Sequence, residues 1–303
     1  MRMEKEAQRA SAADLYEPLA LSAPLAWARA AELCPPAADS RGECVWYHRV
    51  WQYLRLLGVI TTVATNADFL IAFFRERARA GGFRRVLISA AADYALLAHI
   101  AHAYRLENAP LEVTLVDRCG TAIFLNRWYA EHAAVDLDAR VGDVLTYVAK
   151  EPFDVVCSHN FLSRFRAEER PRLIERWHAH LRAGGVAVTT QRIRPNATYE
   201  RDSFSPDDAS AFAAKVERAA RAYPRPLGVD PGELAAVARE YALRKGGWVI
   251  RSNEEITRAF EAAGFRIERA DHGGGAPERA RDRPSSKAGS DTYRMRLVAE
   301  RVS

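Results

Sequence analysis

The chain has 303 residues, of which 49% are hydrophobic and 27% charged, and its formal net charge is +5. This balance is typical of a globular protein, and the length suffices for one large core with an appended element but not for three ordinary domains. Because arginine and glutamate are interspersed without a long basic block, we expect no nucleic-acid-binding patch. The longest apolar stretches fall far short of the roughly 20 residues that span a bilayer, so we expect no membrane segment.

The four cysteines are Cys34, Cys44, Cys119 and Cys157. Their spacing along the chain matches no metal-binding motif, so the sequence predicts free thiols in a reducing compartment and no bound metal. The N-terminal segment has no long apolar run before a cleavage-like site, so we expect no secretory signal. These features predict a cytoplasmic protein.

Residues 1–83 precede the first predicted core strand and are expected to form helices. Residues 14–33 are rich in alanine and leucine, and residues 44–57 carry an apolar stripe with the i, i+3, i+4, i+7 spacing of one helix face. We expect Thr65 to cap a third helix, with Asp68 three residues further on.

Aromatic side chains are concentrated in the second of these helices and have two interpretations. Trp46, Tyr47, Trp51 and Tyr53 either pack a helical subdomain onto the core or cover a ligand pocket. Aromatic faces attract a cation when water is excluded. Tyr47 and Trp51, which lie on the apolar stripe, are the candidates for such a lid.

The stretch from residue 84 to residue 143 begins as strand, turn and helix. Residues 86–88 are apolar and mostly β-branched, as a strand buried on both faces requires. The following residues are small up to Asp93, which allows the backbone to turn tightly and approach a ligand closely. Apolar side chains then recur at helical spacing through residues 94–104.

The next two predicted strands each end in an acidic residue. Asp117 closes residues 111–117, and Asp143 closes residues 139–143. In a nucleoside-binding α/β unit, an acid at the end of the second strand accepts hydrogen bonds from the ribose hydroxyls. The segment therefore predicts a nucleoside-binding site.

The fourth predicted strand, residues 153–160, leads into a polar segment. Side chains at the carboxyl ends of strands in an open α/β sheet face the ligand crevice, and here they are Ser158, His159, Asn160 and Phe161. His159 is a candidate general base, because the unperturbed pKa of histidine lies close to neutrality. A packed histidine that moves no proton is the alternative.

The fifth predicted strand, residues 181–190, is followed by a mostly helical insertion at about residues 196–247. Arg192, Arg194 and Tyr199 leave the sheet at the ligand end and are candidate substrate contacts, with a solvated loop as the alternative. Helices are expected to begin at Ser205 and Asp230.

The C-terminal part is predicted as a helix, two strands and a loop. Ser252 begins the helix, and residues 265–270 form a strand. Residues 272–290 have almost no apolar side chains and are expected to form a mobile loop. Residues 292–302 alternate in polarity and should pair antiparallel with the preceding strand.

The segments 84–143, 153–160 and 181–190 together resemble the cofactor-binding core of a class I S-adenosylmethionine (SAM)-dependent methyltransferase. The resemblance implies an α/β fold with a Rossmann-like seven-stranded, mostly parallel sheet that ends in an antiparallel C-terminal hairpin. It further implies an N-terminal helical cap over residues 1–83 and a SAM-binding domain over residues 84–303 that contains the helical insertion.

The glycine-rich signature of that family is altered in this sequence. Aligned on the first strand, the glycine positions are occupied by Ala90, Ala92 and Tyr94, and the usual acid within the strand is replaced by Ile88. Because alanine avoids positive φ angles, we expect φ in this turn to stay negative.

The resemblance also implies which residues bind the ligands. Asp117 would hold the ribose, Asp143 the adenine amine, and the turn at residues 89–93 the amino-acid tail of SAM. The implied cofactor-binding residues are Ser89, Ala90, Ala91, Ala92, Asp93, Tyr94, Asp117, Arg118, Gly142, Asp143, Val144, Ser158 and Asn160. The implied acceptor-binding residues are Tyr47, Trp51, His159, Phe161 and Arg192.

The function that the resemblance implies is methyl transfer from SAM to a small-molecule nucleophile in a closed pocket, with S-adenosylhomocysteine as product. The altered glycine signature keeps two alternatives open. One is a SAM-consuming reaction, either cyclisation or aminocarboxypropyl transfer, that releases methylthioadenosine. The other is a SAM-binding scaffold without catalysis. The acceptor, the atom methylated and the oligomeric state stay open.

Overall fold

The computed structural model of the protein describes residues 17–35, 44–60, 62–273 and 292–302. Residues 14–16, at the start of the first predicted helix, and residues 274–290 of the predicted mobile loop lie outside this part. Within the described ranges no helix is long and apolar enough to cross a membrane.

The core is a seven-stranded sheet with the strand order β3-β2-β1-β4-β5-β9-β8. Its strands are β1 (Arg85–Ser89), β2 (Glu112–Asp117), β3 (Asp136–Val141), β4 (Phe153–His159), β5 (Leu181–Ile193), β8 (Phe265–His272) and β9 (Tyr293–Arg301). Strands β1 to β5 are parallel, whereas β9 runs antiparallel to both of its neighbours, β5 and β8. The predicted Rossmann-like sheet with an antiparallel C-terminal hairpin is confirmed, and the strand order reverses between β1 and β4.

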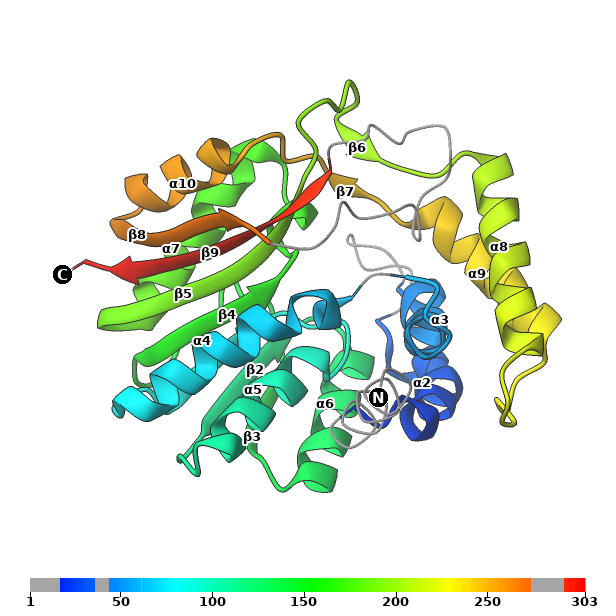
Figure 1. Ribbon diagram of the computed structural model, residues 1–303, viewed down its shortest axis with the longest axis horizontal. Coiled ribbons are helices and arrows are strands. Elements are labelled where there is room, and N and C mark those ends of the chain that lie inside the picture. Colours follow the sequence, from blue (N-terminus) through cyan, green and yellow to red (C-terminus); the bar gives the residue numbers. More distant parts are fainter. Residues whose placement is uncertain (1–16, 36–43, 61, 274–291, 303) are drawn as a thin grey trace, which may run out of the picture.

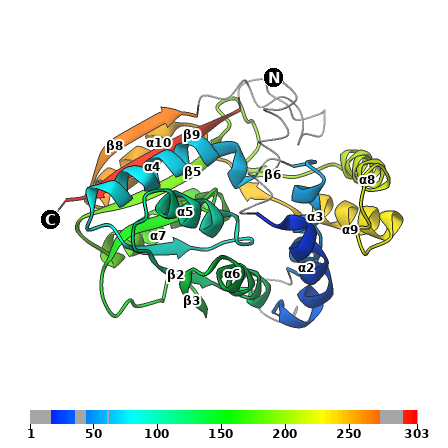
Figure 2. The same ribbon diagram turned by 60° about the horizontal axis from the view of Figure 1, so that its bottom comes forward.

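Helices cover both faces of this sheet (Figures 1 and 2). One face carries α4 (Ala67–Ala80), α5 (Ala95–Leu106) and α6 (Gly120–Ala133), and the other carries α7 (Arg170–His180) and α10 (Asn253–Ala262). Successive side chains of β1 enter different layers, because Val86 and Ile88 belong to the hydrophobic cluster that contains Phe74 of α4, whereas Leu87 belongs to the cluster that contains Trp177 of α7. Burial on both faces explains the uninterrupted apolar run of this strand.

A separate group of helices lies beyond the carboxyl ends of the parallel strands (Figure 1). It consists of α2 (Leu19–Leu33), α3 (Val45–Leu56), α8 (Pro206–Arg221) and α9 (Pro231–Arg244). Tyr53 and Leu54 of α3 share a hydrophobic cluster with Phe212 of α8 and Tyr241 of α9. The N-terminal helices and the insertion, which is flanked by the short strands β6 (Arg201–Asp202) and β7 (Gly247–Trp248), therefore build one cap. Helix α4, although within residues 1–83, belongs to the sheet layers.

The starts of the insertion helices follow the sequence prediction, whereas the start of α4 does not. Ser205 Oγ accepts a hydrogen bond from the Asp208 N–H, and Asp230 Oδ1 accepts one from the Gly232 N–H. Thr65 was expected to cap α4, and this is wrong. A 3-10 turn, η1 (Val63–Asn66), precedes α4, and Thr62 is its cap. The Thr65 hydroxyl instead donates to the Thr62 carbonyl at 2.8 Å, a local bond that competes with helix capping.

Within the described ranges, two alanines adopt the left-handed conformation that usually favours glycine. Ala90, in the turn after β1, has a φ of 64°, so the expectation of a negative φ there is wrong. Its N–H donates to the Val116 carbonyl at 3.0 Å, and this bond to β2 holds the turn in that conformation. Ala134 ends α6 with a φ of 51°.

Replacing Ala134 by glycine tests the cost of this conformation away from the pocket. Ala134 is exposed and ends its helix, so glycine relieves the clash of Cβ without opening a cavity. We expect Ala134→Gly to raise the free energy of unfolding by about 1 kcal/mol in a denaturant titration. The control Ala133→Gly, in the last helical position, should lower it by about 0.5–1 kcal/mol. Destabilisation by both changes would contradict the left-handed assignment.

Candidate functional site

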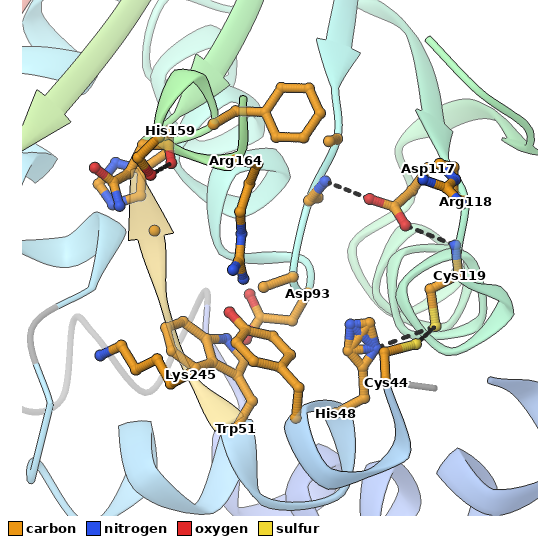
Figure 3. Close-up of a pocket in the computed structure, with 18 of the residues that line it drawn as sticks. Cys44, His48, Trp51, Asp93, Asp117, Arg118, Cys119, His159, Arg164 and Lys245 are labelled. Atoms are coloured by element: carbon orange, nitrogen blue, oxygen red, sulfur yellow. Dashed lines mark hydrogen bonds between the residues drawn. The ribbon is translucent and has the colours of Figure 1, made fainter. Parts of the chain in front are cut away.

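A pocket of about 570 Å³ lies between the carboxyl ends of the parallel strands and the cap (Figure 3). Its volume is within the range of about 300–1,000 Å³ that is typical of small-molecule sites. Segments from the turn after β1, the ends of β2, β3 and β4, helix α3 and the β7 region line it. The pocket lies where the strand order reverses, which is the usual ligand position in open α/β sheets.

Asp117, at the end of β2, holds two neighbouring backbone turns. Its Oδ2 accepts a hydrogen bond from the Ala91 N–H at 3.0 Å, and its Oδ1 accepts one from the Cys119 N–H at 2.7 Å. Burial raises the pKa of Asp117 to about 6, although both hydrogen bonds act to lower it. Because a carboxylate offers about four acceptor sites, Asp117 retains capacity for hydroxyl groups of a ligand.

Asp143 follows β3 and lines the same side of the pocket as Asp117. Its Oδ1 accepts a hydrogen bond from the Leu145 N–H at 3.0 Å. The Gly142 N–H donates to the carbonyl of Asp117 at 2.9 Å, so the loops after β2 and β3 are tied together. The two acids that the sequence analysis singled out are thus brought to one end of the pocket.

Asp93 connects the turn after β1 to the cap. The Arg55 guanidinium of α3 donates to Asp93 Oδ2 at 2.6 Å and also pairs with Glu17. The other oxygen of Asp93 accepts a hydrogen bond from the Ala95 N–H at 2.9 Å, at the start of α5. All three charged side chains are buried. Both oxygens of the Asp93 carboxylate therefore have partners within the protein, and they hold the turn after β1 against the cap.

Most of the residues implied by the resemblance line the pocket. They are Tyr47, Trp51, Ala90, Ala91, Ala92, Asp93, Asp117, Arg118, Gly142, Asp143, Val144, His159, Asn160, Phe161 and Arg192. Arg194 also lines it, whereas Tyr199 does not.

Three implied cofactor contacts lie outside the lining, because their side chains are engaged in the core. Ser89 Oγ accepts a hydrogen bond from the Trp177 indole N–H at 2.8 Å. The Tyr94 hydroxyl is 2.7 Å from Ser22 Oγ of α2. Ser158 is 1% exposed and bonds within the sheet. These three side chains therefore lie in the core behind the residues that line the pocket.

Aromatic rings from both halves of the cap form one wall of the pocket. Tyr47 and Trp51 of α3 stack with ring centroids 5.0 Å apart, and Tyr241 of α9 lies 5.6 Å from Tyr47. Burial raises the pKa of Tyr47, so its phenol stays neutral. Tyr241 was missed by the sequence analysis, because its helical spacing alone does not distinguish a pocket residue from a core residue.

His159 and Asn160 end β4 at the floor of the pocket. His159 Nδ1 lies 2.6 Å from Thr190 Oγ1. Burial, reinforced by the neighbouring Arg294 and Arg192, lowers the pKa of His159 well below its ordinary value. The imidazole is therefore neutral at physiological pH but a weak proton acceptor. The Asn160 side chain accepts a hydrogen bond from the Arg192 N–H at 3.1 Å.

The side of the pocket opposite Asp117 is basic (Figure 3). Arg164 donates to the Gly246 carbonyl at 2.9 Å, and its guanidinium carbon lies 5.7 Å from the centre of the Tyr47 ring. Lys245 Nζ lies 5.3 Å from the Tyr241 ring centre. Neither cation was identified from the sequence. Arg164 follows β4 and Lys245 follows α9, and the two lie near each other only because the end of the insertion packs against the segment after β4.

Arg55 offers a stability test of the link between cap and turn. Arg55→Met leaves Asp93 and Glu17 buried without their counter-charge, so we expect a loss of about 3–5 kcal/mol in the free energy of unfolding. Arg49 on the same helix pairs with Glu233 at the surface, at 3.1 Å. The control Arg49→Met should therefore cost about 1 kcal/mol or less in the same denaturant titration. Equal losses would show that the buried pair does not hold the cap.

Comparisons with models of protein families and with curated proteins gave no match. Among solved structures, a SAM-dependent methyltransferase from Clostridium acetobutylicum aligns with a TM-score of 0.51 and 10% identity, covering 83% of this chain and 96% of that one. The [4+2]-cyclase SpnF aligns with a TM-score of 0.49 and 15% identity over 78% and 80% of the two chains. Magnesium protoporphyrin IX methyltransferase from Synechocystis, with bound SAM, aligns with a TM-score of 0.47 and 10% identity over 83% of each chain. The protein thus has the fold of the class I SAM-dependent methyltransferases.

Proposed function

We propose that the protein binds SAM in this pocket and transfers its methyl group to a small-molecule acceptor. The observation that supports this most strongly is the pair of acids, Asp117 and Asp143, at the ends of adjacent strands beside the switch in strand order. An acid in the position of Asp117 suits ribose hydroxyls. In this proposal Asp143 contacts the adenine, and the turn from Ala90 to Asp93 receives the amino-acid tail.

The aromatic wall suits the positive charge of the sulfonium. Tyr47 and Trp51 line the pocket with stacked rings. Aromatic faces attract cations more strongly once water is excluded. The cap, built from α2, α3, α8 and α9, is accordingly proposed to close over the reacting groups.

The basic side of the pocket indicates the class of acceptor. Arg164, Arg192, Lys245 and Arg294 all line the pocket, and Figure 3 shows Arg164 and Lys245 away from Asp117, the acid assigned to the ribose. A small molecule that carries a carboxylate or phosphate complements this charge. We therefore propose an anionic small molecule as the acceptor. We further propose that the protein works in the cytoplasm and has neither nucleic acid nor a membrane as partner.

The chemistry requires placement more than proton transfer. The acceptor's lone pair forms the new bond to the methyl carbon while the carbon–sulfur bond breaks, and S-adenosylhomocysteine leaves as a neutral thioether. Sulfonium is a strong electrophile, so alignment in a closed site supplies most of the acceleration, and no metal is needed for the transfer. His159, with its lowered pKa, is assigned to positioning the acceptor.

A second candidate function follows from the turn after β1. Ala90 places a methyl group at a left-handed position that glycine usually occupies, next to the proposed site of the amino-acid tail. A tail bent by this side chain favours attack on its γ-carbon. Such a reaction cyclises or transfers the aminocarboxypropyl group and releases methylthioadenosine.

Incubation of the purified protein with SAM alone distinguishes methyl transfer from the intramolecular attack on the γ-carbon. We expect SAM to remain intact and bound, because the methyl acceptor is absent. Mass spectrometry of the products is the measurement. Accumulation of methylthioadenosine above the rate without enzyme would instead establish attack at the γ-carbon. Calorimetry that detects binding of neither SAM nor S-adenosylhomocysteine would exclude methyl transfer.

Protonation of Asp117 should weaken SAM binding at acidic pH. Because burial raises its pKa to about 6, the carboxylate is ionised above that pH and becomes protonated as the pH falls below it. The ionised form accepts hydrogen bonds at all its oxygen lone pairs, so we expect Kd from calorimetry to rise by up to about tenfold per pH unit below pH 6.

The variant Asp117→Asn should bind at least about tenfold more weakly at pH 7 and lose this pH dependence. The matched control is Asp138→Asn, which changes an exposed carboxylate on β3 that pairs with Arg140. It should leave Kd and its pH profile unchanged. An unchanged affinity of Asp117→Asn would remove the ribose assignment.

A further inference from the structure

Three cysteines and a histidine, which come from three separate segments of the chain, meet beside the pocket. Cys34 follows α2, Cys44 and His48 belong to the start of α3, and Cys119 precedes α6. Their ligand atoms all lie within 4.8 Å of one another. Figure 3 shows Cys44 and His48 converging on Cys119 next to the Asp117 loop.

The separations in this cluster match a tetrahedral metal site. Cys119 Sγ lies 3.6 Å from Cys34 Sγ, 3.5 Å from Cys44 Sγ and 3.1 Å from His48 Nδ1. Tetrahedral zinc, with bonds of about 2.3 Å to sulfur and about 2.0–2.1 Å to nitrogen, requires edges of about 3.8 Å and about 3.6 Å. The three separations from Cys119 are therefore within about 0.5 Å of that geometry, and the remaining pairs of ligand atoms lie within 4.8 Å of one another. The same distances far exceed the length of a disulfide bond, about 2.05 Å.

The chemistry of the donors selects the metal. Thiolate sulfur and imidazole nitrogen favour zinc, whereas magnesium and calcium prefer oxygen ligands. Four protein donors fill a tetrahedral shell, which is typical of a structural rather than a catalytic zinc site. Cys34, His48 and Cys119 are each at most 7% exposed and Cys44 is half-buried, so most of the ligand set is shielded from bulk solvent.

Neighbouring groups support the orientation of the ligands. The Thr121 hydroxyl lies 3.2 Å from Cys34 Sγ. The Cys119 N–H donates to Asp117 Oδ1, which fixes the backbone that presents the Cys119 sulfur. Outer hydrogen bonds of this kind orient metal ligands and increase affinity.

We propose that Cys34, Cys44, His48 and Cys119 bind one zinc ion in a tetrahedral site that fastens α2 and α3 of the cap to the start of α6. The sequence analysis predicted no metal, because the ligands come from three separate elements. The one local signal is the spacing of Cys44 and His48, four residues apart, which places both on one face of a helix. A bond to Cys119 would also restrain the loop that carries Asp117.

Elemental analysis of the untagged full-length protein, purified without chelators, tests the site without any reference to SAM. We expect about one zinc ion per chain by inductively coupled plasma mass spectrometry. Cys119→Ala and Cys34→Ala should each lose at least about tenfold in zinc affinity. The matched control is Cys157→Ala, because Cys157 is buried in β4 outside the cluster. It should retain zinc fully.

Cobalt substitution tests the site in the wild-type protein and does not depend on whether a variant folds. The wild-type protein, stripped and reloaded with Co²⁺, should show thiolate-to-cobalt absorption in the near ultraviolet and the intense visible bands of tetrahedral cobalt. Zinc-free protein that folds normally and gives no such spectrum would overturn the proposal. A zinc-free protein in which two of the clustered thiols are no longer titratable would also overturn it, in favour of a disulfide.

Discussion

The half-buried carboxylate of Asp117 is the constraint on which the pocket depends. It accepts hydrogen bonds from the backbone on either side, from Ala91 in the turn after β1 and from Cys119 before α6. Burial disfavours its charge and raises its pKa, and the two N–H donors offset part of that effect. A ribose that donates further hydrogen bonds to the same carboxylate would therefore bind to a residue already held in place.

The cap is fastened to this edge of the sheet by buried polar contacts as well as by apolar packing. The Arg55–Asp93 pair joins α3 to the turn after β1, and the proposed zinc site would join the same helix to the start of α6. Both contacts lie beside the pocket, so the position of the aromatic wall is coupled to the loops assigned to the cofactor. The insertion contributes Tyr241 to the aromatic wall and Lys245 to the proposed acceptor side of the pocket.

The sequence was most informative where local pattern and burial coincide. The apolar run of β1 and the acids Asp117 and Asp143 predicted the parallel core and the edge of the sheet at which the pocket lies, because strand periodicity and strand ends are local properties. Contacts between distant segments were not predictable in this way. The left-handed φ of Ala90 depends on a hydrogen bond to β2, the joint cap depends on α3 meeting α9, and the cysteine cluster forms only when three separate elements converge.

A crystal structure of the protein with S-adenosylhomocysteine tests the central claim most directly. The account predicts the ribose hydroxyls within hydrogen-bonding distance of the Asp117 carboxylate, the adenine beside Asp143, and the thioether sulfur facing the stacked rings of Tyr47 and Trp51. A nucleoside bound elsewhere, or an Asp117 carboxylate that makes no contact with the ribose, would contradict the assignment of this pocket to SAM.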